Sequence, residues 1–139
     1  MLEAAFVCYA LAVYWEGRSE PEPEARRQIV HVIKNRVHHS AFPNDACSVV
    51  KQKNQFSFFW DGKSDRPKDH RAWQQSMQDV RDAFDAPWEN FGATHYVASY
   101  IKKPTWASSS KMRELGKLGT HIFYFEERRW LRILKRSMI

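Results

Sequence analysis

Apolar residues recur every three or four positions near the start of the chain, and this spacing places them on one face of a helix. Glu16 continues the same face by another three-residue step. Gly17 weakens the helix directly afterwards, and Pro21 and Pro23 prevent its simple continuation. The pattern therefore predicts a first helix whose last turn carries a carboxylate where the buried stripe meets the surface. The apolar face consists of Leu2, Ala5, Phe6, Tyr9, Ala12 and Val13.

The same spacing predicts three further helices. The second starts at Pro23, a residue favoured in the first helical turn, and runs to residue 38 or 39. A short third helix, capped by Asn44 or Asp45, extends to residue 50. The fourth is capped by Asp69 and ends before Pro87. Its core-facing stripe is Trp73, Met77, Val80 and Phe84.

Two short segments, 94–101 and 121–125, have the β-rich composition of strands. We expect them to pair into a small hairpin or sheet. A brief helical turn is expected between them, within 108–115. The sequence shows neither internal repeats nor a linker, so residues 1–139 are predicted to form a single domain. The predicted fold class is α+β, and mostly α.

Length and composition fit one domain with its own core, since 43% of the 139 residues are apolar and 14% are aromatic. The two cysteines, Cys8 and Cys47, are too few for a disulfide framework. We expect both to be reduced core residues and expect no bridge between them. His38 and His39 have no other His or Cys nearby at the spacing of a zinc site. The sequence therefore predicts no metal site and no cofactor.

A net charge of +6 and a pI of about 9.5 draw the chain towards polyanions, among them nucleic acid, anionic lipid, teichoic acid and lipopolysaccharide. Residues 126–139 contribute strongly to this net charge, because they include five basic and only two acidic residues. Several apolar residues lie among them. This pattern is typical of a basic amphipathic C-terminal helix. Such a helix contacts an anionic membrane or lipopolysaccharide, or it packs its apolar face on the domain; the sequence leaves both alternatives open.

A series of short motifs, each weak alone, follows in a fixed order along the chain. They are Tyr14-Trp15-Glu16-Gly17-Arg18-Ser19-Glu20, Ile33-Lys34-Asn35-Arg36-Val37, Phe42-Pro43 with Cys47-Ser48-Val49-Val50, Gln55-Phe56-Ser57, Thr94-His95-Tyr96, Pro104-Thr105-Trp106-Ala107 and Gly119-Thr120-His121-Ile122-Phe123-Tyr124. In order and spacing they resemble the SleB-type cell wall hydrolases, the family of spore-cortex-lytic enzymes and of some phage lysins. The resemblance runs from about residue 2 to residue 124.

The resemblance implies a lysozyme-like fold of the goose-type lysozyme and lytic transglycosylase kind. It also implies cleavage of the peptidoglycan glycan strand between N-acetylmuramic acid and N-acetylglucosamine. In the family motif a Glu is followed by Ala-Arg-Gly-Glu, and here the corresponding residues are Glu16-Gly17-Arg18-Ser19-Glu20. Both acids and the arginine are kept, while the small residues are exchanged in position. Glu16 is therefore the expected catalytic acid.

The chemistry of glycoside cleavage agrees with this assignment, because an acid must protonate the leaving oxygen. Glu20 is the nearest candidate for a second, catalytic or supporting carboxylate. Gly17 and Pro21 make it improbable that both acids project from one continuous helix. If Glu20 instead holds Arg18 or a backbone amide, one acid remains and the sugar's own 6-hydroxyl can attack. We therefore expect lytic transglycosylation ahead of hydrolysis by a muramidase.

Other residues are expected to contact the substrate. Gln55 and Thr94 are candidates for hydrogen bonds to sugar hydroxyls or N-acetyl groups, and His95 is a further candidate contact. The aromatic faces of Tyr96 and Trp106 suit the apolar faces of sugar rings, and Tyr96 is also a candidate for transition-state stabilisation. His95 and His121 lie on the two predicted strands and are expected to face each other, as a structural pair rather than as a proton shuttle. Asn35 and Arg36 are expected to tie the second helix to a neighbouring loop.

An alternative from another class is a basic module that binds single-stranded nucleic acid or an anionic surface without catalysis. The aromatic residues do not gather on strands among basic residues, so we expect no nucleic-acid partner. The expected partner is the glycan strand of peptidoglycan, bound by a monomer. The first residues lack the pattern of a signal peptide. We therefore expect synthesis in the cytoplasm and action on the wall after holin-type release, as for a phage endolysin.

Overall fold

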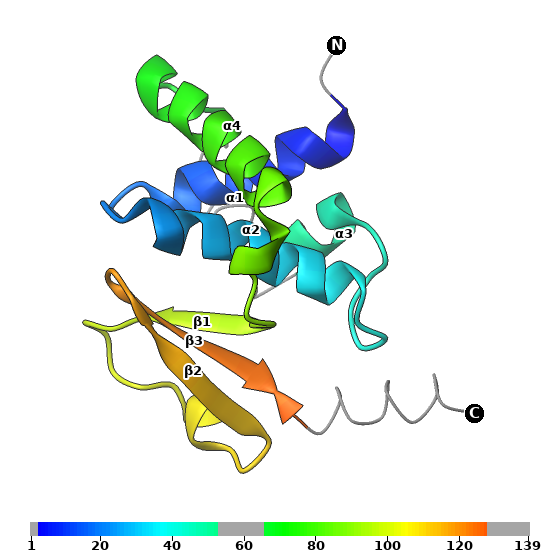
Figure 1. Cartoon of the computed structure of the whole chain (residues 1–139), viewed down its shortest axis with the longest axis vertical. Helices are drawn as coiled ribbons and strands as arrows, with labels where there is room; N and C mark the ends of the chain where they lie inside the picture. The colour runs from blue at the N-terminus through cyan, green and yellow to red at the C-terminus, as the bar shows by residue number, and fades with distance from the viewer. Residues whose placement is uncertain (1–2, 53–65, 128–139) are drawn as a thin grey trace.

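The computed structural model describes residues 3–52 and 66–127, and Figure 1 shows how their elements are arranged. Gln55 and the segment 128–139, including most of the expected C-terminal helix, lie outside the described residues. Helices α1 (Ala4–Gly17), α2 (Pro23–Val37), α3 (Ala46–Val50) and α4 (His70–Asp85) pack together. Short 3-10 helices η2 (Pro87–Glu89) and η3 (Thr105–Ser108) accompany strands β1 (His95–Ala98), β2 (Met112–Leu118) and β3 (His121–Glu126). The expected class, mostly α with a small sheet, is confirmed.

Helix α1 is the centre of the helical part, and it contacts α2, α3 and α4. The apolar spacing indicates one buried face, but α1 is buried on other sides as well. Tyr14, which is not part of that face, is among its buried residues. The Tyr14 hydroxyl accepts hydrogen bonds from the amides of Lys68 and Asp69 at 3.1 and 3.0 Å, which fixes the start of α4 against α1. Asp45 and Asp69 cap α3 and α4 as the sequence predicts.

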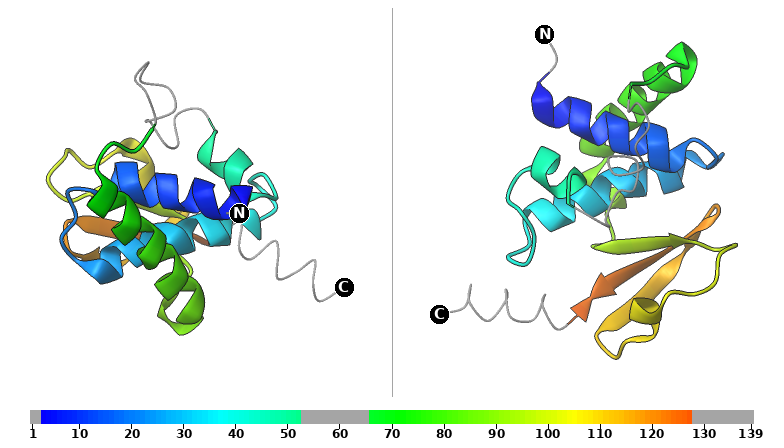
Figure 2. Two further views of the ribbon diagram at one scale, coloured as in Figure 1. Left: turned by 90° about the horizontal axis from the view of Figure 1, so that it is seen from above. Right: turned by 180° about the vertical axis from the view of Figure 1, so that it is seen from behind.

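The sheet lies beside the helices, with β1 next to α2, as the two views in Figure 2 show. Its strand order is β1-β3-β2, and both pairs are antiparallel. The pairing of the two predicted strands is confirmed. The helical turn expected within 108–115 is wrong, because residues 112–118 form β2. Met112 and Leu115 are good helix formers, but both lie in β2, and the pairing of this strand with β3 overrides their local preference.

A disulfide joins Cys8 of α1 to Cys47 of α3. The prediction of two reduced core cysteines is therefore wrong. The two residues are 39 apart in sequence, so spacing alone does not reveal that α3 packs against α1 and brings their Cα atoms to 5.2 Å. That separation is within the reach of a disulfide. The bond ties the short α3 to the central helix.

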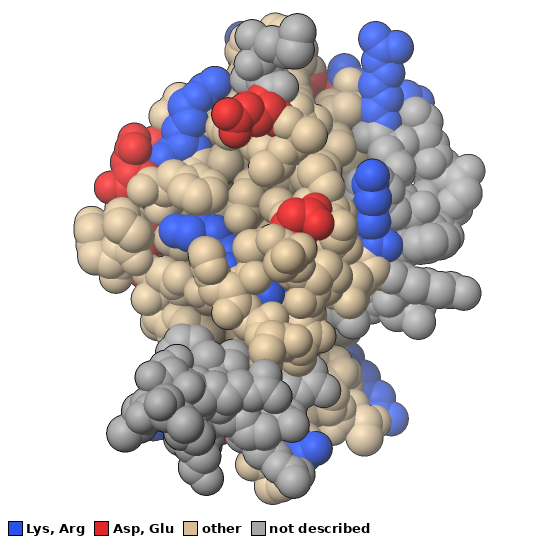
Figure 3. All heavy atoms as spheres, turned by 90° about the vertical axis from the view of Figure 1, so that its right-hand side faces the viewer, with Lys and Arg blue, Asp and Glu red and all other residues tan. Residues whose placement is uncertain are grey.

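Within the described residues, no helix is long and apolar enough to cross a membrane. Figure 3 shows one face of the molecule, on which Lys and Arg side chains stand at several separate places with Asp and Glu among them. The described part of this face thus lacks the continuous basic stripe that a nucleic-acid track requires.

Candidate active site

A cleft of about 480 Å³ opens where the end of α1 meets α2, β1 and η3. It brings together residues that lie far apart in sequence, among them four that the sequence singles out: Glu16, His95, Tyr96 and Trp106. Arg36 and His121 also line it. The rest of the lining comes from Val97, Ala98, Tyr100 and Ile101.

Glu16 is half-buried on the last turn of α1, where its apolar face meets the cleft. Gly17 follows directly and is buried against α2, since a Cβ there would stand 3.3 Å from Ile29 and 3.4 Å from Arg26. The glycine therefore lets α2 pack closely against the helix end that carries Glu16. Among the described residues that line the cleft, Glu16 is the one carboxylate.

Tyr96 of β1 lies close enough to Glu16 and Arg36 for their charges to act on its phenol. Burial raises the pKa of Tyr96 well above its usual value, the Glu16 carboxylate raises it further, and Arg36 lowers it. The Tyr96 hydroxyl therefore keeps its proton at neutral pH and can donate a hydrogen bond within the cleft.

Glu20 is 2% exposed and is not among the residues that line the cleft. Its Oε1 accepts hydrogen bonds from the Thr120 amide at 2.6 Å, the Thr120 hydroxyl at 3.1 Å and His121 Nδ1 at 3.1 Å. Its Oε2 accepts from the Glu22 amide at 3.2 Å. Burial alone raises the pKa of Glu20, but these hydrogen bonds outweigh it and lower the pKa below its usual value.

The structure thus separates the two acids of the sequence motif. Glu20 holds backbone amides, which is one of the two roles expected for a supporting residue. The other expected partner, Arg18, instead pairs with Asp69 at 3.4 Å and lies over the Tyr14 ring. Glu20 is a buried, ionised carboxylate in the loop between α1 and α2, bonded to Thr120 in the turn between β2 and β3, and Glu16 is the acid that reaches the cleft.

Arg36 is a buried cation at the edge of the cleft, 4% exposed. Its Nε donates a hydrogen bond to the Thr94 carbonyl oxygen at 2.8 Å, and its guanidinium lies over the Phe42 ring. Burial lowers the pKa of Arg36 to about 10, so the side chain stays charged at neutral pH. Asn35 beside it donates to the Ala93 carbonyl oxygen at 2.8 Å. The expected tie from α2 to a neighbouring loop is therefore confirmed.

Thr94 is buried beneath the cleft and does not line it. Its hydroxyl lies 2.9 Å from His95 Nδ1 and accepts a hydrogen bond from the Glu126 amide at 3.2 Å. His95 in turn packs on Trp106, whose ring centroid is 5.1 Å away. The structure therefore places Thr94 behind His95, while His95 and Trp106 form one wall of the cleft.

The expected pairing of His95 with His121 is wrong, because the register sets His95 opposite Tyr124 and His121 opposite Ala98. Each imidazole instead has its own polar partner, Thr94 for His95 and Glu20 for His121. Both rings line the same cleft. Sequence reasoning missed His121 as a cleft residue, although its place in the motif 119–124 marks it.

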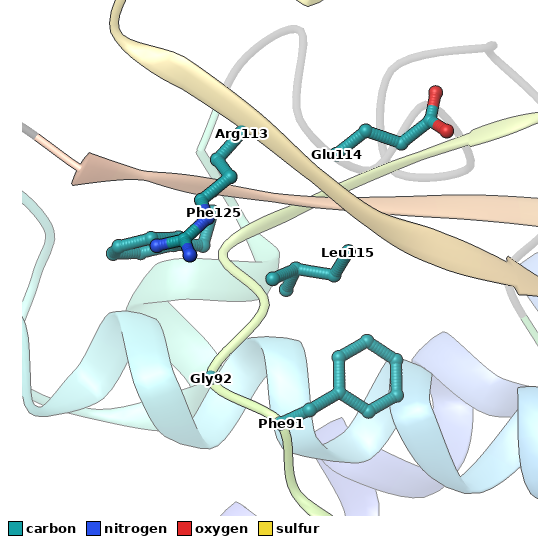
Figure 4. A pocket seen from close by; sticks show the side chains of 6 residues that line it. All are labelled: Phe91, Gly92, Arg113, Glu114, Leu115 and Phe125. Carbon is teal, nitrogen blue, oxygen red and sulfur yellow. The ribbon is translucent and has the colours of Figure 1, made fainter.

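A second hollow, of about 480 Å³, lies on another part of the sheet, and its residues are shown in Figure 4. The Arg113 guanidinium lies over the Phe125 ring, and Leu115 and Phe91 point towards the same space, whereas Glu114 points away from it. This hollow is mainly apolar and does not include the residues that the motifs single out.

A family model described as "Cell Wall Hydrolase" matches residues 20–124. The catalytic domain of the Bacillus cereus SleB protein is 27% identical, with a TM-score of 0.68 over 86% of this chain and 88% of that one. The catalytic domain of the germination-specific lytic transglycosylase SleB from Bacillus anthracis is 25% identical, with a TM-score of 0.70 over 88% of this chain and 95% of that one. No curated protein matches the chain.

These similarities confirm the resemblance drawn from the motifs and the lysozyme-like fold that it implies. Glu20 is the first residue of the segment that the family model matches, and Glu16 lies just before it. The assignment of Glu16 therefore depends on the cleft geometry and on the sequence motif.

Proposed function

Because the chain belongs to the cell wall hydrolase family, we propose that it cleaves the glycan strand of peptidoglycan between N-acetylmuramic acid and N-acetylglucosamine, with Glu16 as the general acid. The chain is a peptidoglycan-degrading enzyme.

The observation that carries the proposal is the different placement of Glu16 and Glu20. Hydrolysis with two carboxylates requires both to flank the scissile bond, at about 5 Å in retaining enzymes and about 6.5–9.5 Å in inverting ones. Glu20 is buried under four hydrogen bonds and does not line the cleft. One cleft carboxylate favours lytic transglycosylation over the alternative of a muramidase.

The reaction is then a proton transfer coupled to an intramolecular attack. Glu16 gives its proton to the glycosidic oxygen as the bond from that oxygen to C1 of the muramic acid breaks. The 6-hydroxyl of the same sugar forms a new bond to C1 and loses its proton, in the simplest form to the Glu16 carboxylate. The product is a 1,6-anhydromuramic end, and no water is consumed.

Other cleft groups have supporting roles in this proposal. Tyr96, kept protonated by burial and by the neighbouring Glu16, donates a hydrogen bond where charge develops in the transition state. Trp106 offers an aromatic face to a sugar ring, and His95 a polar contact beside it. The Bacillus anthracis relative is described as a lytic transglycosylase, which supports the same reaction here.

The test is mass spectrometry of the soluble products formed from purified peptidoglycan. Glu16→Gln removes the proton donor at nearly constant shape, and Asp85→Asn, an exposed acid on α4, is the matched control. We expect anhydromuramic ends from wild type and Asp85→Asn and none from Glu16→Gln. Reducing muramic ends would instead establish the muramidase. No products from peptidoglycans of several chemotypes would favour a binding module without catalysis.

We propose further that the enzyme acts as a phage endolysin, which reaches the wall after holin-type release. The resemblance to phage lysins supports this role, and the net charge of +6 favours adsorption to anionic wall polymers. Expression in a bacterial host with and without a holin tests it. We expect lysis only when the holin is present, and lysis without the holin would contradict the proposed route.

A further inference from the structure

The imidazole of His121 stands between a buried carboxylate and the cleft. Its Nδ1 lies 3.1 Å from Glu20 Oε1, and its ring is among the residues that line the cleft. Both side chains are almost fully buried, Glu20 at 2% and His121 at 6% exposure. Since Nδ1 is engaged with Glu20, Nε2 is the ring nitrogen that remains for a group bound in the cleft.

Glu20 also fixes which nitrogen of His121 carries the proton. An ionised carboxylate only accepts hydrogen bonds, and the hydrogen bonds around Glu20 keep its pKa low. Nδ1 must therefore be the protonated nitrogen of the pair, and in the neutral ring Nε2 keeps a free lone pair. The Nε2 atom of His121 is thus an acceptor for a proton.

His95 differs from His121 in this respect. Its Nδ1 lies 2.9 Å from the Thr94 hydroxyl, and that hydroxyl already accepts a hydrogen bond from the Glu126 amide. The Thr94 hydroxyl can still donate to His95 Nδ1 or accept from it, since a hydroxyl has one proton and two acceptor sites. The carboxylate beside His121 therefore fixes the tautomer of that ring, whereas the hydroxyl beside His95 does not.

We propose that His121 accepts the proton of the attacking hydroxyl during glycan cleavage, and that Glu20 is the positioning residue that holds His121 for this step. The proposal rests on the proposed function. Glu16 protonates the leaving oxygen as before, and the sugar's 6-hydroxyl forms its bond to C1 while its proton passes to His121 Nε2. His121 then releases this proton to water and Glu16 takes one from water, so the proton balance closes.

The loop that carries Glu20 is held by a further buried ion pair besides the hydrogen bond to His121. Arg26 donates to the Glu20 carbonyl oxygen at 3.0 Å, and Arg26 is itself paired with buried Asp79 at 2.7 Å. Removing two charged groups from water has a large desolvation cost. An imidazole that is held at Nδ1 and lines the cleft gives this arrangement a catalytic use.

Several titratable groups lie around the His121 ring. Tyr96 of β1 contacts the ring, with centroids 5.5 Å apart. The remaining titratable groups that line the cleft are Glu16 of α1, Arg36 of α2, His95 of β1 and Tyr100, which follows β1.

The experiment is the pH dependence of kcat on purified, soluble glycan strands for wild type, His121→Gln and Glu20→Gln. A single carboxylic acid that works alone gives a rate that only falls as the pH rises. A required imidazole must be unprotonated to accept the proton, so the rate also falls at low pH. Wild type is therefore expected to have a bell-shaped profile of kcat against pH. We expect His121→Gln to lose about 100-fold in kcat, with little change in KM, and to lose the acid-side limb.

Glu20→Gln keeps a hydrogen-bond acceptor beside Nδ1 but removes its charge. We expect this variant to keep a bell-shaped profile with one limb moved to lower pH, since the imidazolium loses its carboxylate partner. A purely structural role for the pair predicts lower melting temperatures with an unchanged profile, and that result would overturn the proposal.

Nitrogen-15 NMR of the histidine rings provides a readout that does not depend on turnover. The signals of His121 are identified by their absence from His121→Gln. At pH 8 we expect Nδ1 to be protonated and Nε2 unprotonated, and the reverse tautomer would overturn the proposal. Products from wild type with an unchanged profile in His121→Gln would reject this inference alone. No products from wild type would reject the proposed function and this inference with it.

Discussion

The backbone of Gly119 lies directly against the carboxylate of Glu20. A Cβ at position 119 would overlap both carboxylate oxygens, and the residue has a φ of 56°, in the left-handed region. Gly119→Ala must therefore displace Glu20 from its partners Thr120 and His121. We expect a loss of about 3 kcal/mol in the free energy of unfolding, measured by urea denaturation, because strain and lost hydrogen bonds add.

Gly92 provides the matched control for this substitution. It also has a positive φ, 80°, but nothing lies within 4 Å of a Cβ placed there. Gly92→Ala thus introduces the backbone strain without the overlap, and we expect its free energy of unfolding to fall by about 1–2 kcal/mol. Equal losses for Gly92→Ala and Gly119→Ala would show that the Glu20 contact contributes nothing to stability.

A second prediction concerns acid sensitivity through His31 of α2. The ring is fully buried, and neither nitrogen has a hydrogen-bond partner among the described residues. Burial, and then the nearby Lys34, lower the pKa of His31 to about 4. Since the unfolded chain binds the proton near pH 6.5, stability is complete above that pH and falls as the pH drops from 6.5 to 4.

His31→Leu removes this proton linkage without removing a hydrogen bond. We expect the variant to be at least as stable as wild type at pH 7, and to lose less stability than wild type between pH 6.5 and 4. Urea denaturation at several pH values measures both. Parallel curves for wild type and His31→Leu would contradict the assignment of acid sensitivity to His31.

The expected helices and the pairing of the two strands follow from local patterns, because periodicity, capping residues and prolines act within a few positions. The misplaced features depend on distant contacts. Strand β2 forms because β3 supplies its partner, and Cys8 meets Cys47 because α3 packs on α1. For the same reason the sequence places Glu16 at the edge of a buried face, but it does not reveal that Glu20 turns towards Thr120, one hundred residues away.

The disulfide leads to a third prediction. Linking Cys8 to Cys47 restricts the unfolded chain over a separation of 39 residues. In the chain-entropy description, a loop of this length stabilises the folded state by about 2–4 kcal/mol. We therefore expect the double variant Cys8→Ala with Cys47→Ala to have a lower melting temperature than oxidised wild type. A reducing agent should lower the melting temperature of wild type and leave that of the double variant unchanged, whereas equal shifts would contradict the prediction.

The last prediction compares Trp106 with an exposed tryptophan elsewhere. Trp106 lines the cleft, and its ring packs against His95 and Tyr124. Losing an aromatic contact with a sugar ring costs ~1 kcal/mol, so Trp106→Ala should raise KM for soluble glycan strands roughly fivefold. Trp88 is 82% exposed on η2 and outside the cleft, so Trp88→Ala should leave KM unchanged. Trp106→Phe should recover most of the affinity, because a ring again faces the sugar. A similar KM for Trp106→Ala and Trp88→Ala would remove Trp106 from the substrate-binding surface.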